Sequence, residues 1–396
     1  MKIDHIDVIN LRFDYPGMHG FESSGGVTSS RVTSLVVVHT DTGATGVGSA
    51  YSHPGLVYLT IKGQLEPLLQ GSDPREVETL WKKMYDWTRW YGRKGAAMSA
   101  LGGLDVAFWD LRGQALGRPL WSLFGAERGA CPAYASALLW NTPAGLAAEA
   151  QQHLTRGFRR MKMRLGQSEE YDTAAVQAVR QAIGPEHDLL CDASMRYHVE
   201  LARRIGGVLA EQRVFWFEEP FAPEDIDAYA ALRGTVAVPV AAGENEFGTQ
   251  GFAELIQRQA VDIVQPDASR CGGISEVRRV ADLAARAGLR VAPHSWSDAV
   301  AILANAHVVA SLPHGITVEI DQTGNPFVEE LLVEPLQVVD GQLRLGDRPG
   351  LGIELNWKVV ERLRMSNPLQ PPDGCDSDMV FGPSWNRPFG PYRERT

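Results

Sequence analysis

Six polar residues that could do acid, base or metal chemistry recur through the chain at a nearly constant spacing. They are Asp192, Glu218, Glu244, Asp267, His294 and Glu319. Successive members lie 26, 26, 23, 27 and 25 residues apart, by subtraction of their numbers. Any one of the acids could be the N-cap of a following helix. Because all six keep the same step, they indicate a ring of side chains at the same point of a repeating structural unit.

The first three acids of this series predict a metal site. Carboxylates of Asp192, Glu218 and Glu244, if brought together by neighbouring strands, would repel one another unless a cation lay between them. Oxygen-only ligands suit Mg²⁺, with Mn²⁺ as a substitute, and they leave positions open for oxygens of a substrate.

The next two members predict a base. An aspartate such as Asp267, bonded to one imidazole nitrogen, fixes the tautomer of a histidine and raises the basicity of its other nitrogen. A lone histidine is more often a core or capping residue. The place of His294 in the series instead favours a general base.

Two cations precede the ring. Lys162 and Arg164 are two residues apart in a predicted strand, so their side chains point to the same side. The alternative is an exposed strand edge, which a closed parallel barrel lacks. Cations inside a barrel require anions nearby, which the predicted acids and a substrate carboxylate would supply.

Short apolar segments alternate with amphipathic helical segments from about Cys131 onward, at close to 25 residues per unit. This alternation is typical of an α/β parallel barrel, whose active site lies at the carboxyl ends of the strands. The predicted strands are Ala133–Ser136, Arg160–Arg164, Leu189–Asp192, Trp216–Glu218, Val240–Ala242, Ile263–Gln265, Val291–Pro293 and Thr317–Ile320.

The first hundred or so residues predict a separate α+β unit. Alternation in Lys2–Leu11 and Thr33–Thr40 indicates strands, and Leu80–Trp90 has helical spacing. Between the two strands, Tyr15–Ser30 is rich in Gly and Ser. It is either a slack connection or a mobile lid over a site.

Composition limits the classes of function. The 396 residues are 44% hydrophobic and 22% charged, which is ordinary for a globular protein of two domains. The net charge of −10 disfavours nucleic acid and anionic membranes as partners. No C-x-x-C pair, signal peptide or apolar span of about 18 residues is recognisable. We therefore expect a cytoplasmic enzyme with four reduced thiols, Cys131, Cys191, Cys271 and Cys375.

Several short motifs resemble the mandelate racemase branch of the enolase superfamily. They are Phe217-Glu218-Glu219-Pro220, Ala242-Gly243-Glu244-Asn245, Gln265-Pro266-Asp267, Cys271-Gly272-Gly273-Ile274 and Ala292-Pro293-His294. Leu104–Asp110 resembles the family's helix that joins cap to barrel. Pro349–Glu354 is similar to the same region of acid-sugar dehydratases and of the galactarolactone cycloisomerase.

The resemblance implies a (β/α)7β TIM-type barrel at residues 128–325, under an α+β capping domain at residues 1–127. Residues 326–396 would return to the cap. It also implies that Asp192, Glu218 and Glu244 hold one Mg²⁺, that Asp267 and His294 form a base dyad and that Glu319 hydrogen-bonds the substrate carboxylate. Lys162 would stabilise enolate oxygens. Arg164 is a departure, because many members have Lys-x-Lys where this chain has Lys162-Met163-Arg164.

The predicted function is dehydration of a sugar acid, an aldonate or aldarate, to a 2-keto-3-deoxy acid. Alternatives are a cycloisomerase or epimerase of a sugar acid or its lactone and, more remotely, a non-catalytic sugar-acid binding protein. A hydrolytic barrel metalloenzyme would require histidine ligands, which Tyr134-Ala135-Ser136 lacks.

Polar residues of the cap are candidates for substrate contacts. The substrate-binding candidates are His19, Arg31 and His53, with Arg93 and Lys94 as further polar residues of the cap loops. Each is equally consistent with a solvated loop residue. Apart from a small-molecule sugar acid, we expect only further copies of the chain as partners, in a homo-oligomer between a dimer and an octamer.

Overall fold

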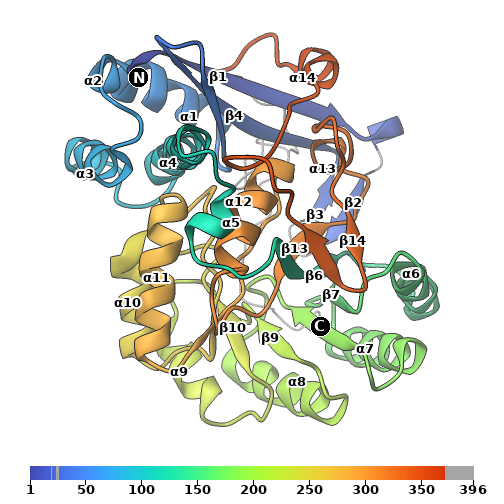
Figure 1. The fold of residues 1–396 in the computed structure, drawn as a ribbon. Coiled ribbons are helices and arrows are strands. Elements are labelled where there is room, and N and C mark those ends of the chain that lie inside the picture. Colours follow the sequence, from blue (N-terminus) through green and yellow to red (C-terminus); the bar gives the residue numbers. More distant parts are fainter. Residues whose placement is uncertain (19, 24–25, 371–396) are drawn as a thin grey trace.

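The computed structural model describes residues 1–18, 20–23 and 26–370. An antiparallel sheet with its helices lies against one end of a parallel barrel (Figure 1). His19, one of the predicted substrate contacts, lies outside the described residues. So does the proline-rich and aromatic end of the chain after Gln370.

The cap is a three-stranded antiparallel sheet in the order β1–β4–β5. Its strands are β1 (Ile3–Asp14), β4 (Ser30–Thr40) and β5 (Thr45–Ala50). A short hairpin of β2 (Phe21–Ser23) and β3 (Gly26–Thr28) stands beside them. The cap helices are α1 (Pro54–Thr60), α2 (Glu66–Leu69), α3 (Val77–Thr88) and α4 (Ala96–Ala115). A short π-helix, η2 (Ile61–Leu65), lies between α1 and α2.

Helix α4 joins the cap to the barrel, and the predicted joining segment Leu104–Asp110 lies within it. Gly48 of β5 allows the closest approach, because a Cβ there would stand 1.9 Å from the carbonyl oxygen of Gly103. On its other side α4 reaches the barrel, where Asp105 accepts from the backbone N–H and the hydroxyl of Ser275, at 2.9 and 2.6 Å. Nearly every residue of α4 is therefore buried.

Eight parallel strands form the barrel, as the alternating pattern predicts. They are β6 (Ala130–Ser136), β7 (Arg160–Arg164), β8 (Asp188–Asp192), β9 (Trp216–Glu218), β10 (Val240–Ala242), β11 (Ile263–Val264), β12 (Arg290–Val291) and β13 (Val318–Asp321). Neighbours in sequence are neighbours in space from β6 to β12, and β13 pairs with β6. The ring closes where the N–H of Ile316 donates to the carbonyl of Val291 at 2.8 Å.

Seven helices connect these strands, which gives the (β/α)7β arrangement. They are α6 (Pro143–Thr155), α7 (Glu169–Ile183), α8 (Val199–Glu211), α9 (Ile226–Arg233), α10 (Gly248–Gln257), α11 (Ile274–Arg286) and α12 (Ala299–Val309). A four-residue helix, α5 (Leu120–Leu123), lies between the cap and β6.

The barrel interior is packed rather than hollow. Its apolar layer is Tyr134, Leu190, Trp216, Ala241, Ile263, Ala292 and Ile316. Alternate residues of a strand point to the same side. Asp192 and Glu218, which come two residues after Leu190 and Trp216, therefore also point into the barrel, one layer nearer to the carboxyl ends of the strands.

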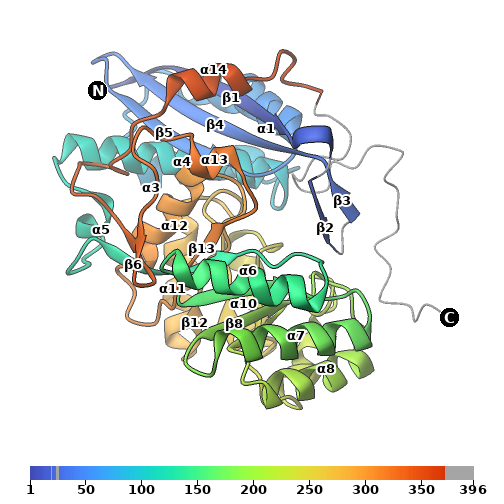
Figure 2. The same ribbon diagram turned by 90° about the vertical axis from the view of Figure 1, so that its right-hand side faces the viewer.

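After β13 the chain does not form another full barrel helix, as predicted, and the four-residue helix α13 (Pro326–Glu329) comes next. A hairpin of β14 (Val338–Val339) and β15 (Gln342–Arg344), which the sequence pattern did not predict, pairs antiparallel with the first half of β6. Helix α14 (Trp357–Leu363) then lies along the cap beside β1 (Figure 2). No helix among the described residues is long and apolar enough to cross a membrane.

Candidate active site

The three predicted metal ligands meet at the carboxyl ends of β8, β9 and β10. Asp192, Glu218 and Glu244 each offer a carboxylate oxygen, and these atoms lie within 4.8 Å of one another. Asp192 and Glu218 are buried, whereas the side chain of Glu244 keeps 20% of its surface exposed. Two buried oxygens of this set, Asp192 Oδ2 and Glu244 Oε2, have no hydrogen-bond partner among the described residues, although the first is ion-paired with Arg164 and the second lies 3.7 Å from His294 Nε2. A donor set made only of oxygens, with two lacking hydrogen bonds, fits Mg²⁺.

Lys162 lies among these acids with no exposed surface on its side chain. Its ammonium group is 2.6 Å from Glu218 Oε1, 2.9 Å from Glu319 Oε1 and 3.5 Å from Asp192 Oδ2. Burial favours the neutral amine, but the charges of Glu218 and Glu319 outweigh it and raise the pKa of Lys162 overall. The lysine is therefore a fixed positive charge that can donate to anionic oxygens.

Arg164 points to the same side of β7 as Lys162. It forms an ion pair with Asp192, and its guanidinium carbon lies 5.0 Å from the ring centre of Trp296. Burial opposes the charged form, but Glu244 and Glu319 outweigh it and raise the pKa of Arg164. This side chain therefore carries a permanent positive charge that can pair with anionic oxygens.

His294 and Asp267 form the predicted pair. His294 Nδ1 is 2.8 Å from Asp267 Oδ2, and since the carboxylate only accepts, Nδ1 carries the proton of this bond. His294 Nε2 faces the acids, 3.7 Å from Glu244 Oε2 and 3.9 Å from Glu319 Oε2. Burial lowers the pKa of His294, but the charges of Glu244, Glu319 and Asp267 raise it to about 9. A cation among the carboxylates would lower this pKa, because it would offset the charge of Glu244.

The site carries a surplus of negative charge. Among the described residues of the ring, the carboxylates of Asp192, Glu218, Glu244, Asp267 and Glu319 face two permanent cations, Lys162 and Arg164. The neighbouring Glu219 is not counted, because burial raises its pKa to about 8. Even a protonated His294 leaves two negative charges in excess. One divalent cation would balance them.

Residues that sequence reasoning missed hold the acids and the base in place. Asn305 Nδ2 donates to Asp267 Oδ1 at 3.1 Å and to the carbonyl of His294 at 3.0 Å, while its oxygen accepts from the N–H of Ala268. Asn305 thereby ties together the two loops that carry the dyad. The sequence does contain a signal, since this amide interrupts a run of apolar residues in α12. Trp216 is a second case, because its Nε1 donates to Glu218 Oε2 at 2.8 Å.

The cap covers the dyad through the segment between β5 and α1. The N–H of Tyr51 donates to the carbonyl of Ser269 at 2.9 Å, and the Tyr51 ring stacks on His294 with centres 6.3 Å apart. His53 accepts from the N–H of Leu56 at 3.3 Å and so caps α1. A contact between His53 and a substrate stays a prediction.

Arg31 of β4 is buried between the cap and the barrel. It forms an ion pair with Asp321 at 2.9 Å, and its Nε donates to the hydroxyl of Tyr15 at 2.9 Å. Its guanidinium carbon lies 5.2 Å from the ring centre of Phe21 and 4.7 Å from that of Trp296. The indole of Trp296 thus contacts both Arg31 and Arg164. Through these contacts Arg31 links the cap to the barrel. A direct contact between Arg31 and a substrate stays a prediction.

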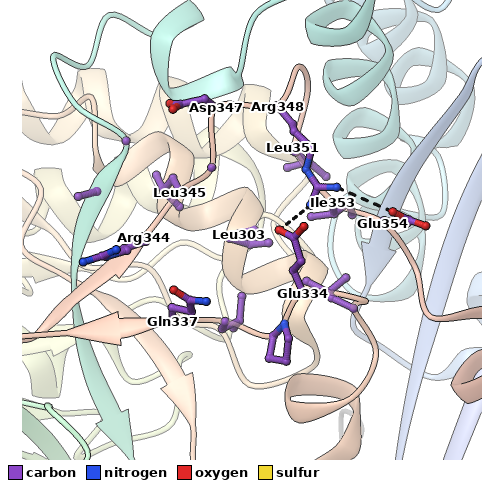
Figure 3. Close-up of a pocket in the computed structure, with 17 residues that line it drawn as sticks. Leu303, Glu334, Gln337, Arg344, Leu345, Asp347, Arg348, Leu351, Ile353 and Glu354 are labelled. Carbon is purple, nitrogen blue, oxygen red and sulfur yellow. Dashed lines mark hydrogen bonds and ion pairs between the residues drawn. The ribbon is translucent and has the colours of Figure 1, made fainter.

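A surface pocket of about 500 Å³ lies elsewhere, between the segment after β13 and helix α12 (Figure 3). Arg348 and Glu334 point toward one another across it at 3.0 Å. None of the predicted site residues lines it.

Comparison with known families matches both halves of the chain. Residues 145–359 match the model described as enolase C-terminal domain-like. Residues 14–125 match the N-terminal domain of mandelate racemase / muconate lactonizing enzyme.

Individual relatives cover most of the chain. It is 35% identical to the D-galactarolactone cycloisomerase of Agrobacterium fabrum, over 93% of this chain and 100% of the relative. It is 31% identical to an arabinonate dehydratase of Saccharolobus solfataricus, over 83% and 89%. A racemase from Streptomyces coelicolor, solved with bound magnesium, superposes with a TM-score of 0.85 and is 29% identical, over 92% of this chain and 100% of that one.

Proposed function

Because this chain belongs to the mandelate racemase / muconate lactonizing enzyme family of the enolase superfamily, we propose that it is a magnesium-dependent dehydratase of a sugar acid. It removes the proton next to the carboxylate and eliminates the β-hydroxyl, which gives a 2-keto-3-deoxy acid. The observation that carries this proposal is the Asp267–His294 pair. Nε2 of His294 faces the oxygen-only cluster, in a site whose carboxylates exceed its cations by two charges even when His294 is protonated.

Asp192, Glu218 and Glu244 would hold the Mg²⁺. The ion supplies a Lewis acid that offsets negative charge on substrate oxygens. The surplus charge and the lack of a hydrogen-bond partner for Glu244 Oε2 among the described residues support this assignment.

His294 is the proposed base. Its Nδ1 is committed to Asp267, so Nε2 is the atom that takes the α-proton. The electron pair of the broken C–H bond passes to the carboxylate carbon and gives an enolate, whose oxygens receive hydrogen bonds from Lys162. As the carbonyl reforms, the electrons form the double bond to the β-carbon and the β-hydroxyl leaves. His294 returns its proton to that hydroxyl, water departs, and the enol becomes the ketone.

Arg164 lies where relatives with Lys-x-Lys would have a second base, and its guanidinium keeps its proton. We therefore propose that only the His294 face of the α-carbon exchanges protons. Following the α-proton of both epimers in deuterated water by nuclear magnetic resonance tests this assignment. Rapid interconversion of the epimers would overturn it and favour an epimerase.

A second candidate is a cycloisomerase of a sugar lactone. It is favoured by the 35% identity that extends over the full length of the D-galactarolactone cycloisomerase. The same proton removal would then expel the ring oxygen of the lactone in place of a hydroxyl, so that no water is released.

A substrate screen separates the two. Aldonates, aldarates and their lactones would each be incubated with Mg²⁺ and followed for 2-keto product by mass spectrometry. Product lighter than its open-chain substrate by one water identifies a dehydratase. Product only from lactones, at unchanged mass, identifies a cycloisomerase. Failure of every acid and lactone to give keto product or to exchange its α-proton would overturn both candidates.

A further inference from the structure

A second cluster of potential metal ligands lies on the cap, on strands β1 and β4. His5, Asp7 and His39 each offer one ligand atom, and these three atoms lie within 4.8 Å of one another. All three side chains reach the surface, with 50%, 53% and 27% of their areas exposed. We propose that this cluster binds a borderline divalent cation such as Zn²⁺, independently of the magnesium site in the barrel.

The sheet register brings the three ligands together. His5 of β1 lies directly opposite His39 of β4 in the antiparallel pair. Asp7 follows His5 by two residues and so points to the same face of the sheet. Directly opposed residues have Cβ atoms about 4.5 to 5.5 Å apart. Two hydrogen-bonded strands therefore hold the ligands, which leaves only side-chain rotations to be fixed on binding.

The separations suit one ion. His39 Nε2 and Asp7 Oδ2 are 3.1 Å apart. Two ligands of a tetrahedral Zn²⁺, with bonds of about 2.0 to 2.1 Å, stand about 3.3 Å apart. Without a metal, a proton bridges these two atoms. The cation would take its place, since metal binding to imidazole releases protons.

A hydrogen bond to Asp4 fixes the tautomer in which His5 can bind a metal. His5 Nδ1 is 2.9 Å from Asp4 Oδ2, and because the carboxylate only accepts, the neutral ring carries its proton on Nδ1. The lone pair is then on Nε2. Histidines that bind metals commonly donate their other N–H to a carboxylate in this way.

The two imidazoles are stacked in the structure. The His5 and His39 rings are 4.2 Å apart and nearly parallel, at 6°. Because the lone pair of an imidazole nitrogen lies in the plane of its ring, one ring must turn about its side-chain bonds for both to reach one ion. Such a rotation leaves the two paired strands in place.

The ligand types separate this cluster from the barrel site. Imidazole nitrogen with one carboxylate suits Zn²⁺, Ni²⁺ or Cu²⁺, whereas the oxygen-only set of Asp192, Glu218 and Glu244 suits Mg²⁺. The inference does not depend on the proposed function, and its test does not use turnover.

The test is a titration of untagged, chelator-treated protein with Zn²⁺ in millimolar Mg²⁺, followed by calorimetry. We expect one Zn²⁺ per chain for the native protein and no binding to this cluster for His39→Gln. Asp4→Asn should weaken binding by about 10- to 100-fold, as loss of an outer hydrogen bond does. Cobalt substitution should show the visible absorption of a histidine-bound ion, which His39→Gln abolishes.

His187→Gln is the matched control, because His187 also lies near one acid, 4.0 Å from Glu186, but belongs to no ligand cluster among the described residues. It should bind Zn²⁺ as the native protein does. Circular dichroism would establish that each variant is folded. Equal Zn²⁺ affinity in the native protein, His39→Gln and Asp4→Asn would overturn the inference, as would a lack of Zn²⁺ binding by the magnesium-saturated native protein.

Discussion

The mouth of the barrel and the seam between cap and barrel both bury charged side chains. At the seam these side chains are compensated by hydrogen bonds and opposite charges, whereas at the mouth negative charge remains in excess. At the seam, Asp298 accepts from the hydroxyls of Thr33 and Ser49 at 2.6 Å each, and from the N–H groups of Val300 and Ala301. At the mouth, acids outnumber cations and Glu244 Oε2 has no hydrogen-bond partner among the described residues. The seam is therefore built to hold the domains together, and the mouth is built to receive a ligand.

The comparison predicts opposite consequences for the two regions. A change at the mouth should remove activity and leave the fold intact, because its surplus of like charge does not stabilise the protein. A change at the seam should remove stability, because a buried charge or donor would lose one of the partners that compensate its burial.

The largest effect should come from loss of the metal. Chelation should abolish turnover and added Mg²⁺ should restore it, and Glu244→Gln should abolish turnover even with Mg²⁺ present. In chelator, the free energy of unfolding of Glu244→Gln should equal or exceed that of the native protein, because one of five repelling charges is gone. Urea denaturation and a turnover assay measure both. Full turnover in chelator would contradict the metal assignment.

The next effect concerns the base. His294→Asn should lower kcat by about one hundred- to ten thousandfold, which is the usual contribution of a general base. Asp267→Asn should also impair turnover, because the imidazole would lose its fixed tautomer. Exchange of the substrate's α-proton with deuterium is the decisive measurement. Exchange at the native rate in both variants would show that another group is the base.

A seam variant should show the reverse pattern. Arg31→Met leaves Asp321 buried without its cation and should cost about 3 to 5 kcal/mol of unfolding free energy. The double variant Arg31→Met, Asp321→Asn should recover part of that loss, since no unpaired charge remains. Denaturant midpoints of the single and double variants test this. A single variant as stable as the native protein would remove the distinction between seam and mouth.

The smallest effect is a pH dependence at the seam. Burial raises the pKa of Asp105 to about 7, although hydrogen bonds from Ser275 oppose the rise. Between about pH 4 and 7 the folded protein keeps a proton that the unfolded chain releases, so this contribution to stability is lost as pH rises through that window. The stability difference between the native protein and Asp105→Asn should therefore shrink from pH 5 to pH 8, on the order of 2 kcal/mol. An equal difference at both pH values would mean that Asp105 is ionised throughout.

The sequence predicted the barrel and its ring well because both are local patterns. An acid at the end of an apolar strand is conspicuous, and a step near 25 residues places it without any knowledge of distant contacts. The roles assigned to Asp267 and His294 rest on the same register, whereas the role of Lys162 rests on the resemblance to the family. The geometry that brings them together agrees with those roles, which the variants above would test.

Features that depend on how distant segments meet were not predictable. The sequence does not indicate that Arg31 pairs with Asp321, because this ion pair forms only when the cap docks on the barrel. The pairing of His5 with His39 depends on a register that shifts by a bulge between Ile3 and His5. The hairpin of β14 and β15 consists of strands of two and three residues, too short for a periodic signal.

The contact between α14 and the cap has a consequence for the order in which the chain folds. The N–H of Met365 donates to the carbonyl of Asn10 at 2.8 Å, on the side of β1 that β4 does not cover. A ribosome adds about 5 to 20 residues per second, so β1 emerges roughly 20 to 70 s before that partner. During this time its open edge can pair with strands of other chains. The first strand made is thus among the last to be completed.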